Sequence, residues 1–307
     1  MPDIVTLTMN PALDIATSAE AVVPTDKVRC SPPRHDPGGG GINVARVVRT
    51  LGGDALAVYP AGGPAGLALE TLLERDGAPH RRIPIFGPTR ESFTVDERRS
   101  GQQYRFVLPG PVLSEAEHKA CLDGLAEAAS DARFIVASGS LPSGVGADFY
   151  QKAADVAKGL GIRFVLDTSG EALRHMRSGV HLLKPSIREL REWTGSELRS
   201  EAQQIEAVRQ LIGRGICEII VISLGAEGAL LVTEEMHERL APIEVPVRSA
   251  VGAGDSMVAA ITYGLARGLD LRNAIRLGMA AGAATVMTPG TELCRREDVE
   301  RLYGASL

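Results

Sequence analysis

The sequence predicts an α/β fold in which a mainly parallel central sheet is flanked by helices. Short aliphatic runs alternate along the chain with longer amphipathic stretches, and this β-α-β-α order is typical of a parallel sheet covered by helices. The chain has 307 residues, of which 44% are hydrophobic and 23% charged, the composition of a globular protein with a sizeable core. We expect one domain over residues 1–307 that carries a small β-sheet lid.

Buried strands are predicted at the short aliphatic runs, and helices where apolar residues recur about every 3.6 positions. Gly52 and Gly161 directly follow two of the helical stretches, as helix C-caps often do. The predicted strands cover residues 4–9, 55–59, 134–137, 164–167, 181–183 and 219–224. The predicted helices cover residues 42–51, 67–75, 114–129, 149–160, 187–193, 201–214, 253–267 and 271–287.

Two segments interrupt this alternation. Residues 17–34 are polar and contain several prolines, and residues 90–108 hold two β-rich runs joined around Ser100 and Gly101. These pieces are too short to form a core of their own. We therefore expect a small β appendage that covers the main domain as a flap or pairs with a second subunit.

Composition and charge exclude several classes of protein. Lys and Arg number 33 and Asp and Glu 38, so the net charge is −5 and no global positive field favours nucleic acid. The longest uncharged stretches fall short of the roughly 20 apolar residues that span a bilayer. The N-terminal segment has neither the basic nor the apolar part of a secretory signal. We expect a cytoplasmic protein that binds neither nucleic acid nor membrane.

The cysteines and histidines give no metal or disulfide pattern. The four cysteines lie far apart without a C-x-x-C pair, which indicates ordinary free thiols. No H-E-x-x-H motif and no His/Cys cluster has metal-ligand spacing. A metal ion would arrive with a substrate.

The segment SAVGAGDSM, residues 249–257, runs through a Gly-rich turn into a predicted helix. Gly252 and Gly254 allow backbone N–H groups to converge, and the helix N-terminus adds positive potential, so this turn suits a phosphate or a developing phosphoryl charge. Asp255 stands at the helix start. Asp is also a favoured N-cap, so a purely stabilising role for Asp255 stays open.

A second Gly-rich stretch, PGGGGINVAR, leads into the helix predicted at residues 42–51. A dinucleotide-binding fingerprint is excluded, because Asn43 occupies the place of the last glycine and the preceding PPRHDP is not expected to form a strand. The P-loop motif is absent as well. This leaves recognition of sugar hydroxyls by Asn43 and backbone groups, or a plain flexible turn.

Two predicted strand ends carry residues suited to a nucleotide. Ser223, Gly225 and Gly228 follow one strand, where backbone groups can approach phosphates, although an ordinary hairpin turn has the same pattern. Lys184 ends another strand, and Glu189 lies on the next helix. Lys184 suits a phosphate and Glu189 suits Mg²⁺ held through water; a solvated helix N-terminus is the alternative.

Arginines lie on both arms of the β appendage. Arg90 and Arg105 are placed to clamp a phosphate by paired hydrogen bonds, although surface arginines are common. No G-x-S-x-G elbow and no Cys–His signature supports nucleophilic hydrolysis.

The motifs taken together resemble the ribokinase-type family of sugar kinases. TLTMNPALD, PGGGGINVAR, SGSLPSG, LDTSGEAL, KPSIREL, SLGAEGAL and AVGAGDSM occur in the order of that family, over about residues 5–303. GQQYRFVLPG, GGGGINVAR and GTELC further resemble the branch that phosphorylates phosphosugars. The resemblance implies a ribokinase-like fold and transfer of the γ-phosphoryl of MgATP to the C1 hydroxyl of fructose 6-phosphate.

The same resemblance implies roles for individual residues. Asp255 would be the base, and the anion hole would be formed by Gly252, Ala253 and Gly254. Sugar hydroxyls would be held by Asp14, Gly39, Asn43 and Ser138, and the 6-phosphate by Arg90, Arg105 and Lys27. The ATP site would contain Lys184, Ser186, Ser223, Gly225 and Gly228. Glu189 would organise Mg²⁺ through water, and Ser249 and Val251 match positions that bind K⁺. The β appendage would be a lid and the contact of a homodimer.

The chain departs from the family pattern at two places. The N-x-x-E magnesium motif reads S-x-x-E, with Ser186 in place of Asn and Glu189 retained. Thr288 and Glu292 stand where relatives carry Asn and Arg near the K⁺ ligands. We expect catalysis to survive the first change.

Three rival functions follow from the same residues. A kinase acting on fructose 1-phosphate or tagatose 6-phosphate shares the GAGD helix and the TMNPALD start, and QYRFV in the lid favours fructose 6-phosphate. A non-catalytic sugar-phosphate or nucleotide binding protein conflicts with the intact Asp255 and its glycine turn. A hydride-transferring dehydrogenase lacks its fingerprint.

Overall fold

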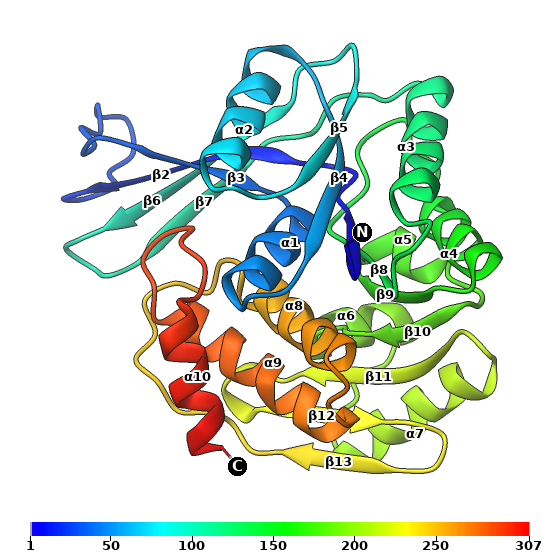
Figure 1. The fold of residues 1–307 in the computed structure, drawn as a ribbon. Coiled ribbons are helices and arrows are strands. Elements are labelled where there is room, and N and C mark those ends of the chain that lie inside the picture. The colour runs from blue at the N-terminus through cyan, green and yellow to red at the C-terminus, as the bar shows by residue number, and fades with distance from the viewer. Residues whose placement is uncertain (1, 307) are drawn as a thin grey trace.

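The computed structural model describes residues 2–306 and contains two separate sheets (Figure 1). Within those residues the larger sheet has nine strands in the order β13-β12-β11-β10-β9-β8-β1-β4-β5. Neighbours from β5 to β11 are parallel, and β12 and β13 are antiparallel at one edge. The bounds are β1 Ile4–Leu7, β4 Ala55–Ala61, β5 His80–Pro84, β8 Phe134–Ser138, β9 Arg163–Asp167, β10 Val180–Leu183, β11 Cys217–Ser223, β12 Ala229–Val232 and β13 His237–Leu240. The predicted mainly parallel sheet is confirmed.

Helices cover both faces of this sheet. Side chains of each strand point alternately to the two faces and pack there in two hydrophobic cores. In β8, Phe134 and Val136 belong to one core and Ile135 and Ala137 to the other. The first core includes α1 Gly40–Thr50, α2 Gly63–Arg75, α8 Ala253–Ala266, α9 Leu271–Val286 and α10 Arg296–Ala305. The second includes α3 Glu115–Ala128, α4 Phe149–Leu160, α5 Gly170–Arg174, α6 Ile187–Thr194 and α7 Glu201–Gly213.

The eight predicted helices and six predicted strands are all present, with ends that differ by a few residues. Further elements were not predicted, namely β5, β13, α5, α10 and the short 3₁₀ helix η1 Gly225–Glu227. Of these, α10 is amphipathic, with Val299 and Leu302 buried. β5 and β13 are the edge strands of the large sheet, so charged residues such as Arg81 and Glu238 are tolerated there.

The small sheet has the order β3-β2-β6-β7, with β2 Ala12–Ala19, β3 Arg34–Gly38, β6 Arg90–Glu97 and β7 Gln103–Val107. β6 and β7 lie inside the predicted segment 90–108, whereas β2 begins before residue 17 and β3 continues past residue 34. The expectation that PPRHDP forms no strand is wrong. β3 is an edge strand that pairs only with β2, and an edge strand tolerates Pro37. Its antiparallel pairing with β2, outside the large sheet, still differs from a dinucleotide-binding βαβ unit.

No helix among residues 2–306 is long and apolar enough to cross a membrane. The four cysteines are free thiols, as predicted: Cys30 is exposed, and Cys121, Cys217 and Cys294 are buried.

Candidate active site

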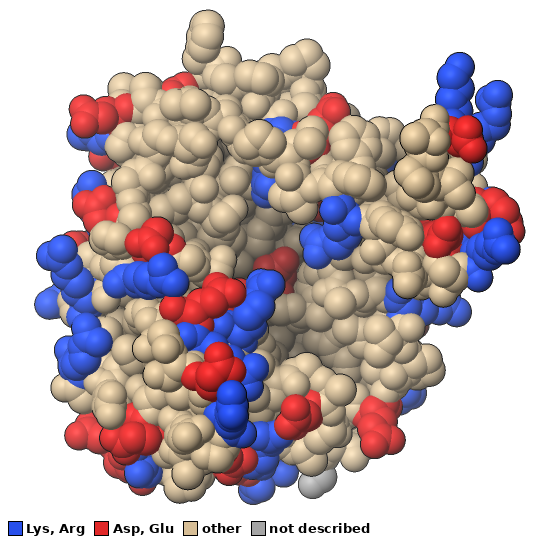
Figure 2. Space-filling view, turned by 180° about the vertical axis from the view of Figure 1, so that it is seen from behind, with Lys and Arg blue, Asp and Glu red and all other residues tan. Residues whose placement is uncertain are grey.

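The large sheet and the helices on its two faces are called the large domain below. A polar cavity of about 230 Å³ lies between the small sheet and this large domain. It brings together the inner face of the small sheet, the start of α1, the end of β8 and the first turn of α8. Figure 2 shows a hollow on one face of the molecule, with acidic atoms at its floor and basic side chains nearby. The cavity is lined by Ala12, Asp14, Gly39, Gly40, Asn43, Arg90, Ser92, Phe93, Thr94, Arg105, Val107, Gly139, Val251, Gly252, Asp255 and Thr291.

Asp255 is held at the floor of this cavity by two hydrogen bonds. Asn43 Nδ2 donates to Oδ2 at 2.9 Å, and Ser138 Oγ donates to Oδ1 at 3.2 Å. Burial raises the pKa of Asp255, although the bonds from Asn43 and Ser138 and the charge of Lys184 oppose the shift. The alternative of Asp255 as a helix cap is wrong, because Gly252 occupies the N-cap with φ +76° and Asp255 is the third helical residue.

The register of the small sheet places charged groups on its inner face. Asp14 pairs with Ser92, and Arg105 pairs with Thr94, so these side chains share one face. Burial raises the pKa of Asp14 to about 6, even though Arg90 and Arg105 lower it. The inner face therefore carries a carboxyl group beside two guanidinium groups.

Arg90 is half-buried and incompletely bonded. It donates from Nη2 to the Asn10 carbonyl at 3.0 Å and from Nη1 to the Leu108 carbonyl at 3.2 Å, whereas its buried Nε has no partner among the described residues. Burial lowers its pKa, and the nearby Asp14 opposes the shift. A guanidinium with a spare buried N–H facing a polar cavity suits an anionic ligand.

A second, mainly apolar cavity of about 520 Å³ lies on the other side of the first turn of α8. The two cavities meet at this turn, because Val251, Gly252 and Asp255 line the polar one and Ala253 and Gly254 line the apolar one. The apolar cavity is lined by Ser223, Gly225, Ala226, Gly228, Pro242, Ile243, Glu244, Val245, Val247, Ala253, Gly254, Met257, Met279, Gly282, Ala283 and Val286.

Lys184 and Asp167 form a buried ion pair under this turn, with 3.2 Å between Lys184 Nζ and Asp167 Oδ1. A Cβ atom on Gly254 would lie 3.5 Å from Lys184 Nζ, which shows how closely the lysine approaches the turn. Burial lowers the pKa of Lys184, but Asp167 and Glu189 raise it more, so the ammonium stays charged. Burial raises the pKa of Asp167 to about 6 despite Lys184. Asp167 is a site residue that was not predicted, although it ends β9, the strand beside β10, and belongs to the motif LDTSGEAL.

Ser186 and Glu189 form a capping box at the start of α6. Ser186 Oγ accepts from the Glu189 backbone N–H at 3.2 Å, and Glu189 Oε2 accepts from the Ser186 N–H at 2.7 Å. Because Ser and Asn are comparable N-caps, the exchange of Asn for Ser preserves this helix start. Glu189 also raises the pKa of Lys184, which places its carboxylate near the buried ion pair.

Lys27 lies outside both cavities, in the exposed segment between β2 and β3. Ser249 is buried and lines neither cavity; its hydroxyl donates to the Gly290 carbonyl at 2.6 Å and accepts from the Val251 N–H at 3.2 Å.

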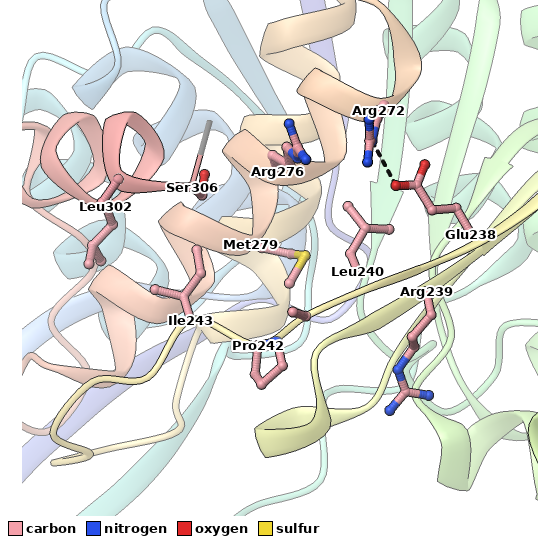
Figure 3. Close-up of a pocket in the computed structure, with 12 residues that line it drawn as sticks. Glu238, Arg239, Leu240, Pro242, Ile243, Arg272, Arg276, Met279, Leu302 and Ser306 are labelled. Carbon is pink, nitrogen blue, oxygen red and sulfur yellow. Dashed lines mark ion pairs between the residues drawn. The ribbon is translucent and has the colours of Figure 1, made fainter.

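A surface pocket of about 430 Å³ adjoins the apolar cavity between β13, α9 and α10 (Figure 3). Pro242, Ile243 and Met279 line both spaces, so one wall separates them. Arg272 and Glu238 form an ion pair of 2.6 Å in this pocket.

The comparisons with known proteins identify the family. The model of the pfkB family of carbohydrate kinases matches residues 7–298. An ATP-dependent 6-phosphofructokinase isozyme 2 of Mycobacterium tuberculosis is 57% identical over 302 residues, which cover 98% of this chain and 89% of that protein. The chain belongs to the pfkB family of carbohydrate kinases. It is therefore a sugar kinase, as the sequence analysis predicted.

Solved structures of another pfkB kinase have the same fold. Phosphofructokinase-2 from Escherichia coli in complex with potassium superposes with a TM-score of 0.94 at 39% identity, over 99% of each chain. The same enzyme in complex with fructose-6-phosphate gives a TM-score of 0.93 at 38% identity, over 100% of this chain and 99% of that one.

Proposed function

We propose that this pfkB kinase transfers the γ-phosphoryl group of ATP to the C1 hydroxyl of fructose 6-phosphate, giving fructose 1,6-bisphosphate. The observation that carries the proposal is the meeting of a polar, charge-lined cavity and an apolar cavity at the first turn of α8, where Asp255 lies. The names of the relative from Mycobacterium tuberculosis and of the Escherichia coli complex support the choice of sugar.

The polar cavity has groups for both ends of a phosphosugar. Arg90 and Arg105 would bind the 6-phosphate, and the spare Nε of Arg90 offers one of the donors. The sugar hydroxyls would be held by Asp14, Gly39, Asn43 and Ser138. Lys27 would reach a phosphosugar only from a second subunit, since it lies outside the cavity of its own chain.

Asp255 would act as the general base. Its two hydrogen bonds orient the carboxylate, and its raised pKa makes it a better proton acceptor than an ordinary aspartate. It would take the proton from the C1 hydroxyl as the oxygen attacks the γ-phosphorus. The amides of the Gly252–Ala253–Gly254 turn and the helix N-terminus would stabilise the charge on the transferred group.

The apolar cavity would take the nucleoside part of ATP, beside Ser223, Gly225 and Gly228. Lys184 lies beneath the turn and would attract the phosphates. The magnesium ion would be carried by ATP. Glu189, one of whose carboxylate oxygens is free of the capping box, would contact that ion through water, and Ser186 would border the nucleotide.

Potassium and dimer formation are further parts of the proposal. The potassium complex of the Escherichia coli enzyme supports a K⁺ site, and carbonyl groups of Ser249 and Val251 would bind the ion in this chain. The outer face of the small sheet carries Phe93, 36% exposed, and its cross-strand partner Phe106, 51% exposed. Two such faces would pack together in a homodimer, since paired exposed aromatics favour burial. The kinase would act in the cytoplasm, where ATP and phosphosugars are available, in a glycolytic step.

The test is coupled ADP release with MgATP and, separately, fructose 6-phosphate, tagatose 6-phosphate and fructose 1-phosphate, with Asp255→Asn as the control. We expect a strong preference for fructose 6-phosphate that is lost in the variant. Preference for another sugar would retain the mechanism and overturn the substrate. Absence of turnover with all three sugars would overturn the proposed reaction.

A further inference from the structure

The turn formed by residues 288–292, which we call the 288–292 turn, contacts three strands of the small sheet. In Figure 1 this loop rises from the start of α10 toward the small sheet. At the edge strand β3, Arg34 Nη1 lies 3.1 Å from Glu292 Oε2, and Arg34 Nε lies 2.8 Å from Asp36 Oδ2. Thr291 Oγ1 donates to the same Asp36 oxygen at 2.5 Å. The guanidinium of Arg34 therefore bridges a carboxylate of the sheet and one of the turn.

The opposite edge strand, β7, reaches the same turn through Ser249. Gln103 Nε2 donates to Asp96 Oδ1 at 2.8 Å and to Ser249 Oγ at 3.3 Å, and Ser249 in turn donates to the Gly290 carbonyl. Gly290 also packs on β2, since a Cβ atom there would lie 3.3 Å from the Ala16 Cβ. The small sheet is thus attached at both edges to one short segment of the large domain.

The turn is itself braced from the large domain. The Thr288 hydroxyl donates to the Thr285 carbonyl at 2.7 Å and to the Glu292 carbonyl, and Arg295 Nη2 lies 3.2 Å from Glu292 Oε1. Thr288 and Glu292 are the two positions near the proposed K⁺ ligands at which the sequence departs from the family pattern. Here their side chains join the turn to α9 and to the small sheet.

The attached strands carry groups that face the proposed substrate. Thr291 lines the polar cavity, and Asp36 is the direct cross-strand partner of Asp14. A displacement of β3 would therefore move Asp14 and open the cavity beside Thr291. Closed cavities exclude water from phosphoryl transfer, so such an opening would let water compete with the sugar.

We propose that Arg34 is a positioning residue that holds the small sheet closed over the polar cavity by bridging Asp36 and Glu292. This inference rests on the proposed function, and it extends it by naming what keeps water from the reaction. Loss of the bridge weakens phosphosugar binding and allows ATP to be hydrolysed without transfer. MgATP binding is affected less, because the apolar cavity has no lining residue in the small sheet.

The test compares Arg34→Gln, Glu292→Gln and the double variant with the parent chain. Arg301→Gln is the matched control, since Arg301 forms an exposed ion pair with Asp298 on α10 and contacts no residue of the small sheet among those described. The measured quantities are the KM for fructose 6-phosphate, the KM for MgATP, and the ratio of ADP released to bisphosphate formed.

We expect each single variant to raise the phosphosugar KM about three- to ten-fold and to raise the ADP-to-bisphosphate ratio above one. The double variant should resemble the singles, because both remove the same bridge. Arg34→Lys, which retains the charge, should restore part of the coupling. Unchanged KM and a ratio of one in both singles would overturn the proposal.

Amide hydrogen exchange tests the attachment of the small sheet independently of the proposed kinase reaction. If the parent chain turns over no sugar, the kinase assignment fails, but the attachment is still measurable as protection of the β2 and β3 amides. Faster exchange in Arg34→Gln than in Arg301→Gln supports the attachment. Equal exchange in the two variants overturns it. Glu292→Gln supplies the same comparison if Arg34→Gln does not fold.

Discussion

The two cavities that meet at α8 are built in different ways. The polar cavity depends on charged side chains from two separate parts of the molecule, including Asp14 and Arg90 from the small sheet and Asp255 from helix α8. The apolar cavity depends on glycines, aliphatic side chains and the backbone of the large domain. Charged side chains therefore determine the ligand contacts in the polar cavity, whereas shape determines them in the apolar cavity.

This difference has an energetic consequence. Burial shifts the pKa values of Asp14 and Asp255 upward and that of Arg90 downward, so ionised groups in the polar cavity are held at a cost to folding. Among the residues that line the apolar cavity, Glu244 is the only one with an ionisable side chain. Substitutions should thus lower activity sharply on the polar side and mildly on the apolar side.

The largest expected effect is that of Asp255→Asn. An amide cannot accept the proton of the attacking hydroxyl, so kcat should fall about 10²- to 10⁴-fold. The variant retains similar size and both neighbours, Asn43 and Ser138. A steady-state assay, with binding of fructose 6-phosphate followed separately by calorimetry, checks this expectation. A kcat within tenfold of the parent would show that another group is the base.

The pH dependence sharpens the same assignment. Because the folded protein raises the pKa of Asp255, the base becomes protonated as the pH falls through a value above the ordinary 3.8 of an aspartate. The kcat/KM should therefore decline on the acid side before ordinary surface carboxylates titrate. A profile that is flat down to pH 4 would contradict a buried aspartate as base.

A smaller effect is expected for Arg90→Ala. Loss of a charge-assisted hydrogen bond to phosphate costs about 1.5–3 kcal/mol, so the phosphosugar KM should rise about 10- to 100-fold with little change in the KM for MgATP. Arg99→Ala is the control, because Arg99 lies in the turn between β6 and β7 and lines neither cavity. Equal increases in the KM values for the phosphosugar and for MgATP would contradict the assignment of one substrate to each cavity.

Much of this architecture was predictable from the sequence. The strands of the large sheet are buried on both faces, so they appear as aliphatic runs such as Phe134–Ser138. The glycine turns before α1 and α8 signal where the chain approaches a ligand. Local composition therefore marks both the core and the backbone parts of the site.

The remaining features depend on contacts distant in sequence. β3 is a charged edge strand that contains Pro37, so nothing in its own composition distinguishes it from a loop. Asp167 becomes notable only because Lys184, which directly follows the next strand β10, lies 3.2 Å away. The bridge from Arg34 to Glu292 joins residues 258 positions apart. Such pairs cannot be derived from one sequence by periodicity or local motifs.

A modest effect is expected when the apolar cavity is partly filled. Ala283→Leu adds three carbon atoms to a residue that lines it, which should raise the KM for MgATP about five- to tenfold and leave the phosphosugar KM unchanged. Ala305→Leu makes the same substitution in the adjoining pocket of Figure 3, which lies outside the apolar cavity, and serves as the matched control. Steady-state kinetics with each substrate varied in turn checks the result. A rise in the phosphosugar KM alone would reverse the assignment of the cavities.

The smallest effect concerns the free energy of unfolding, and it distinguishes the polar cavity from the apolar cavity without any ligand. Asp14 has a pKa of about 6 in the folded protein against 3.8 in the unfolded chain, so the folded state favours the protonated form. Above pH 6 the folded protein must hold an ionised carboxylate in a buried position, and this lowers the free energy of unfolding. Asp14→Asn, which is always neutral, should therefore raise that free energy at pH 7.5, by about 1–3 kcal/mol.

The sign of the effect follows from the same two pKa values. As the pH falls from 6 toward 3.8, Asp14 becomes protonated in the folded parent before it does so in the unfolded chain, and the cost of burying its charge disappears. The gain in the free energy of unfolding from Asp14→Asn should therefore shrink to about half at pH 5 and nearly vanish at pH 4. Urea unfolding at these three pH values measures it. Ala283→Leu should show no such pH dependence, because no titrating group is changed. A loss at pH 7.5 would mean that the pairing of Asp14 with Arg90 and Arg105 outweighs its burial. A gain that is constant with pH would mean that the effect does not come from the ionisation of Asp14. Either result would contradict a cost to folding from this carboxylate.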